Sequence, residues 1–99
     1  MAQIATTKDI MLYLGVDPED EAAHSVVDGL RLSSIEHLTR VTGKDWAART
    51  DVGTFNSALR LSVWLEYYTL RDETKVTPYL KEHLDGLICS LQLSGGGDT

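Results

Sequence analysis

The chain of 99 residues carries a formal net charge of −6 and 42% hydrophobic residues, which predicts one soluble domain with a single modest core. The acidic balance argues against a sequence-reading nucleic-acid binder, which normally presents a basic face. The one cysteine, Cys89, rules out a disulfide within the chain. The N-terminal residues contain no basic stretch leading into an apolar run, so no secretory signal is expected.

Charge is distributed unevenly along the sequence. Residues 1–28 hold one lysine against six acids, a net −5, whereas residues 29–60 hold five basic and three acidic residues, a net +2. Residues 61–99 are net −3. An acidic patch on one copy can therefore meet a basic patch on another copy; the alternative interpretation is scattered, solvated charge.

Four helices and no strand are predicted in chain order, near residues 7–14, 18–42, 54–72 and 78–93, which makes the fold class all-α. A short helix is followed by a long one, a central apolar one and a C-terminal one. The expected N-caps are Thr7, Asp17, Thr54 and Thr77, and the expected C-terminal glycines are Gly15 and Gly43.

The long second helix has one apolar face, formed by Ala23, Val26, Val27, Leu30, Ser34, Leu38 and Val41, with Ile35 beside it. Small residues inside a helix lower its intrinsic stability, so Gly29, Ser33 and Ser34 predict the close approach of another helix. The residues predicted to be buried within one chain are Leu30, Leu38, Leu59, Leu65 and Leu84.

The central helix is apolar nearly all round, so it is expected to be packed by its own chain and by a neighbouring copy. Arg60 and Glu66 interrupt its apolar run, which excludes a membrane span. A buried Glu66 would need Arg31 or Arg40, or an arginine of another copy, as its partner. The alternative is that Glu66 faces water.

Trp46 lies in the turn-rich connection before the central helix, where it either covers the core or anchors a partner. Cys89 lies among aliphatic residues of the last helix and is expected to be a small buried hydrophobe. One helical domain is predicted over residues 1–93, followed by a flexible, glycine-rich tail over residues 94–99.

The sequence contains no recognisable catalytic or cofactor-binding motif. His24, His37 and His83 do not form the i, i+4 pair of a helical metal site. The acidic run over residues 17–21 lacks the alternating oxygen ligands of a calcium loop. No phosphate-binding glycine loop precedes a helix. The prediction is therefore a protein that is not an enzyme and holds neither a cofactor nor a metal.

Three segments, in this order, resemble the head–tail connector proteins of tailed bacteriophages, the portal adaptors that take part in head completion. They are the short helix and acidic turn DIMLYLGVDPEDE, the helix end IEHLTRVTGK and the aromatic helix LRLSVWLEYYTLRDE. Together they cover about residues 8–73. The match lies in the joint order and spacing of the three segments.

The resemblance implies an all-helical structural protein of the virion. Members of this family form a ring, commonly of twelve copies, in the phage neck between the portal protein and the stopper or tail-completion protein. The genome passes through the central channel during packaging and ejection, so contact with viral DNA would be non-specific. The protein would be made in the host cytoplasm and would have no membrane partner.

A ring requires a heterologous contact between copies, expected here between the acidic first third and the basic middle of the chain. Residues from about Leu91 onward are expected to be mobile in the isolated protein and fixed against the portal. The candidate subunit or partner interface comprises Glu19, Glu21, Arg31, Arg40, Trp46, Arg49, Arg60, Glu66, Leu91 and Leu93.

Two other classes remain open. One is a small acidic regulator that binds a host protein, for example as a DNA mimic, which would need a dense surface array of acids. The other is a helical enzyme or cofactor binder, which would need a polar pocket. Gel filtration at high concentration, or direct imaging of rings, separates these alternatives.

Overall fold

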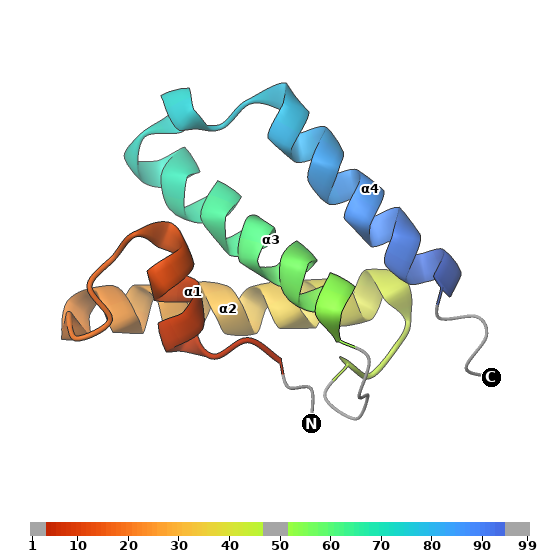
Figure 1. Cartoon of the computed structure of the whole chain (residues 1–99), viewed down its shortest axis with the longest axis horizontal. Coiled ribbons are helices and arrows are strands. Elements are labelled where there is room, and N and C mark those ends of the chain that lie inside the picture. The colour runs from red at the N-terminus through yellow and green to blue at the C-terminus, as the bar shows by residue number, and fades with distance from the viewer. Residues whose placement is uncertain (1–3, 47–51, 95–99) are drawn as a thin grey trace.

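The structure is a computed structural model that describes residues 4–46 and 52–94 (Figure 1). Within these residues the chain forms four α-helices and no strand, which confirms the predicted all-α fold. A short 3-10 turn, η2, precedes the last helix. The elements are α1 (Thr7–Leu14), α2 (Glu21–Thr42), α3 (Gly53–Arg71), η2 (Glu73–Lys75) and α4 (Pro78–Ser94).

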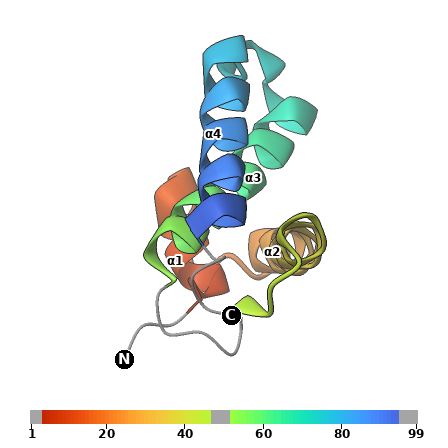
Figure 2. The same ribbon diagram turned by 90° about the vertical axis from the view of Figure 1, so that its right-hand side faces the viewer.

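Helix α3 is the centre of the packing, because it packs against α1, α2, η2 and α4, whereas α2 packs against α1, α3 and α4. Figure 1 shows α3 and α4 as an antiparallel pair that crosses the long helix α2, with α1 beside the first half of α2. In the view of Figure 2, α2 is seen nearly along its axis and the α3–α4 pair stands above it. The central position expected for the apolar helix is therefore observed.

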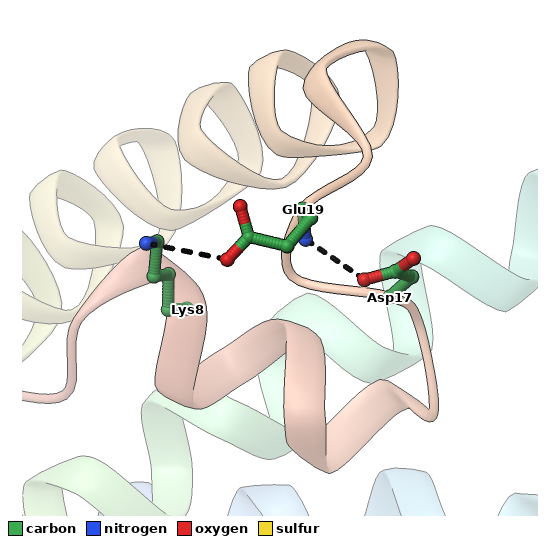
Figure 3. Close-up of polar contacts among 3 residues, drawn as sticks. All are labelled: Lys8, Asp17 and Glu19. Carbon is green, nitrogen blue, oxygen red and sulfur yellow. Dashed lines mark hydrogen bonds and ion pairs between the residues drawn. The ribbon is translucent and has the colours of Figure 1, made fainter.

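The start of α2 differs from the prediction. Asp20, not Asp17, is the N-cap, and its side chain accepts a hydrogen bond of 3.1 Å from the backbone N–H of Ala23. Asp17 instead accepts from the backbone N–H of Glu19 at 2.9 Å, within a turn that precedes the helix (Figure 3). Pro18 suits the second position of a turn as well as the first position of a helix, so the sequence allowed both starts.

Two other N-caps were also misplaced, by one or two residues, although the bounds predicted for the first helix, 7–14, are those observed. Thr6 caps α1 through a reciprocal pair of hydrogen bonds with Asp9, in place of the predicted Thr7. Val52 precedes α3 without a side-chain cap, so Thr54 lies inside the helix. The predicted cap before α4 is confirmed, since Thr77 Oγ1 accepts from Leu80 N at 3.3 Å.

The core lies where α1, α2 and α4 meet around α3. Of the five leucines predicted to be buried, Leu38, Leu59 and Leu65 are, whereas Leu30 and Leu84 are only partly buried against the core. The core members are Ala5, Ile10, Met11, Leu14, Val27, Leu38, Trp46, Val52, Phe55, Ala58, Leu59, Val63 and Leu91.

Helices α2 and α3 approach closely at a pair of serines. Ser62 Oγ donates to Ser34 Oγ at 3.2 Å, and both side chains are buried. This contact confirms the close approach predicted at Ser34. Gly29 and Ser33 are exposed, and an added Cβ at Gly29 would meet no atom within 4 Å, so the prediction fails at these two positions.

The end of α4 is fastened to the end of α2. Lys44 Nζ donates to the carbonyl oxygens of Leu91 at 3.0 Å and of Gln92 at 3.2 Å. Gln92 Nε2 donates in turn to Val41 O at 2.8 Å. Leu91 is only 2% exposed, so the expectation of mobility is wrong at Leu91 and Gln92, which hold these contacts at the end of α4. The expected flexible tail, apart from the helical Ser94, lies outside the described residues.

Candidate subunit interface

The structure separates the ten candidate interface residues into three groups. Trp46 and Leu91 belong to the core of a single chain, and Arg49 lies outside the described residues. The remaining candidates are exposed or half-buried side chains on α2, α3 and α4 and on the turn before α2; they are Glu19, Glu21, Arg31, Arg40, Arg60, Glu66 and Leu93.

Trp46 covers the core and does not present a surface anchor. Its side chain is 2% exposed, and its ring stacks on Phe55 with the ring centroids 5.0 Å apart. The indole Nε1 donates to Thr42 Oγ1 at 2.9 Å, which satisfies the one polar group of the ring. Of the two interpretations of Trp46, the structure supports the core residue.

The acids at the start of α2 have different roles. Asp17 and Asp20 accept backbone hydrogen bonds in the turn and at the cap. Glu19 Oε1 lies 4.0 Å from Lys8 Nζ, an exposed ion pair drawn in Figure 3. Among the described residues Glu21 has no hydrogen bond or ion pair, so it is the acid of this turn whose carboxylate is open to another molecule.

The three described arginines of the candidate set also differ. Arg31 Nε donates to Ala5 O at 2.7 Å, which ties α2 to the segment before α1. Arg40 lies 3.8 Å from Glu36 in an exposed i, i+4 pair. Arg60 is half-buried with its guanidinium 5.9 Å from the centre of the Tyr13 ring, and it makes no hydrogen bond or ion pair within the described part of the chain.

Arg60 lines a hollow of about 240 Å³ between α1, α3 and α4. The pKa of Asp9 is lowered mainly by hydrogen bonds from the backbone and hydroxyl of Thr6. The positive charge of Arg60 lowers it further. The hollow therefore combines a cation with polar and aliphatic groups. Its lining residues are Tyr13, Ser57, Arg60, Leu61, Leu80, His83 and Leu87.

A second hollow, of about 310 Å³, is an open apolar groove between α2 and α3. Leu70 on its rim is 79% exposed, and Val26, one turn before the groove residue Leu30, is 41% exposed. We call this the α2–α3 groove; it is lined by Leu30, Leu65, Glu66, Thr69 and Leu70. One chain thus leaves part of its central helix uncovered.

Glu66 is exposed at this groove. Neither partner considered from the sequence is available within the chain, because Arg31 binds the Ala5 carbonyl and Arg40 lies beside Glu36. Within one chain Glu66 therefore faces water, and its pairing with an arginine of another copy stays a prediction. The carboxylate is free to meet a basic group on another molecule.

The described residues offer no cluster of three or more histidine, cysteine or acidic side chains that could hold a metal ion. Within the same part of the chain, no helix is both long enough and apolar enough to cross a membrane. Cys89 is exposed, in contrast to the buried position expected for it. Its apolar neighbours in sequence face the core, while its own position on α4 points outward.

The comparisons found no family model, characterised protein or solved structure that matches this chain. The resemblance to connector proteins therefore depends on the three sequence segments. Among the polar members of the Arg60 hollow, Tyr13 and Ser57 were not singled out from the sequence, and His83 was considered only as a metal ligand. They come from three helices and share no sequence motif, so only the tertiary fold brings them together.

Proposed function

We propose that the protein is a structural component of a tailed phage that assembles as a ring adaptor in the neck of the virion. One face of the ring would bind the portal, and the other would receive the stopper or tail-completion protein. The DNA channel would run through its centre. The order of helices fits the three sequence segments that resemble connector proteins, with the aromatic segment in α3 at the centre of the fold.

The observation that carries this proposal is the uncovered α2–α3 groove. A chain this short has few apolar residues to leave outside its core, yet Leu70 is 79% exposed beside an apolar hollow. Exposed apolar surface of this kind is typical of sites where a protein binds another macromolecule. In a ring, the groove of each copy would be covered by its neighbour or by the portal.

The acids favour this proposal over a DNA mimic. A mimic needs free carboxylates spaced over one surface, as phosphates are spaced along DNA. Here two of the acids in the turn before α2, Asp17 and Asp20, accept backbone hydrogen bonds, and Glu19 lies beside Lys8. In this turn these acids stabilise the start of a helix, which leaves Glu21 as the one acid of the turn without such a contact.

Sedimentation of purified protein over a wide concentration range tests the proposal. The wild-type chain should form a closed oligomer of defined size. Leu70→Glu should prevent assembly because it places a charge in the groove. Leu32→Glu is the matched control, since Leu32 is also an exposed leucine, 55% accessible, but does not line the groove. Equal assembly of both variants would show that the groove is not an interface.

The neighbouring genes provide an independent test. A portal gene upstream and tail-completion genes downstream would agree with the proposal. A gene located among regulators that act on host proteins, with a product that stays monomeric, would instead favour the alternative of a regulator that binds a host protein.

A further inference from the structure

Arg60 differs from the other described arginines of the candidate set in having no acceptor. A half-buried guanidinium loses part of its hydration, and within proteins it usually regains this through a carboxylate or carbonyl oxygen. Arg31 and Arg40 have such partners at 2.7 Å and 3.8 Å. Arg60 has the face of Tyr13 at 5.9 Å and the more distant negative charge of Asp9, and neither takes up its N–H donors, which are free for another molecule.

The hollow around Arg60 suits a carboxylate at the end of a short aliphatic side chain. Ser57, Tyr13 and His83 add polar groups beside the guanidinium. Leucines on α3 and α4 form the rest of the lining; they are Leu61, Leu80 and Leu87. A volume of about 240 Å³ is below the range of about 300–1,000 Å³ typical of sites for drug-sized ligands and cofactors. An inserted side chain is thus the better fit.

Charge complementarity points to the turn before α2 as the source of this carboxylate. Residues 17–21 contain four acids, the densest negative segment of the chain. Glu21 is the one of these four without a partner, and it is exposed. Glu21 is the first residue of α2 and lines a hollow that shares no residue with the Arg60 hollow. The start of α2 forms one end of the molecule in Figure 1.

We propose that the Arg60 hollow is a carboxylate-binding pocket that receives Glu21 of a neighbouring copy of the chain. This inference rests on the proposed ring assembly and names one of its contacts. Two different patches meet, so the contact is heterologous and can repeat around a closed ring. The guanidinium of Arg60 donates to the inserted carboxylate, and Tyr13 remains beneath the cation.

Charge reversal tests the pair. Arg60→Glu and Glu21→Lys should each weaken self-association about tenfold or more, because a charge-assisted hydrogen bond is lost and like charges face each other. The double variant should recover most of the loss. Arg40→Glu is the matched control with the same change of charge; it should leave association within about twofold of wild type, since exposed ion pairs contribute little.

A disulfide test covers the case in which charge changes disturb folding. On a Cys89→Ser background, the double variant Glu21→Cys and Ser57→Cys should give a ladder of covalent oligomers on oxidation. Glu21→Cys with Leu32→Cys should not. Far-UV circular dichroism checks that each variant is folded.

The outcomes separate the pocket from the ring. If the wild-type chain assembles but neither the reversals nor the cysteines report the Glu21–Arg60 pair, the pocket assignment is overturned and the ring stands. If the wild-type chain stays monomeric at every concentration, both are overturned. A ladder together with rescue by the double reversal supports both.

Discussion

Replacing Leu59 by alanine tests the central position of α3 in the fold. Leu59 is fully buried in the middle of α3, in the core shared with α1, α2 and α4. Removing a buried leucine side chain costs about 2–5 kcal/mol, because apolar contacts are lost and a cavity remains. In a domain of about 100 residues each kcal/mol lowers the melting temperature by about 4–8 °C, so a decrease of about 10 °C or more is expected.

Leu70→Ala is the matched control on the same helix. Leu70 is 79% exposed, so the same chemical change should alter the free energy of unfolding by less than about 0.5 kcal/mol. Urea titrations followed by far-UV circular dichroism give both values from the midpoints, provided that the slopes agree. A loss below about 1 kcal/mol at Leu59, or equal losses at both leucines, would refute the assigned core.

Three further predictions concern the end of α4, the start of α1 and the exposed Cys89. A chain that stops at Ser90 should lose helical signal and melt earlier, because it lacks buried Leu91 and both carbonyl acceptors of Lys44; normal melting would contradict this fastening of α4. Because the pKa of Asp9 is lowered in the folded protein, its carboxylate stabilises folding above the ordinary aspartate pKa, and this contribution is lost as the pH falls through the lowered pKa. Asp9→Asn should therefore destabilise the protein at pH 7, and its difference in melting temperature from wild type should shrink as the pH falls below the ordinary aspartate range; a pH-independent difference would be the contrary result. Exposed Cys89 should react with a thiol reagent in the native protein nearly as fast as in denaturant. A much slower reaction in the native protein would show that the Cys89 thiol is buried.

The helices could be predicted from the sequence because their signals are local. Caps, glycines and apolar spacing depend on neighbours within a few residues, and all four helices were found where these signals lie. The start of α2 was misplaced for the same reason: Asp17 with Pro18 and Asp20 with Glu21 are both adequate starts. Only the turn closed by the hydrogen bond from Asp20 N to Asp17 O decides between them.

Burial at the edges of the apolar stripes required the tertiary structure. Leu30 and Leu84 belong to apolar faces, but the crossing of the helices leaves both at the margin of the core. Leu91 was taken for the start of a mobile tail, because nothing near it in sequence indicates that Lys44, just after α2, donates a hydrogen bond to its carbonyl oxygen at the end of α4. The Arg60 hollow likewise brings together residues from three helices, and no local pattern specifies such a site.

Electron microscopy of the protein mixed with the portal protein encoded in the same genome tests the proposed function most directly. A closed ring, commonly twelve copies in proteins of the resembled family, should cover the tail-side face of the portal, with its channel in line with that of the portal. The Leu70→Glu variant should leave this face bare. A bare portal beside monomeric wild-type protein, at concentrations where the chain is folded, would contradict the assignment of the protein as a neck adaptor.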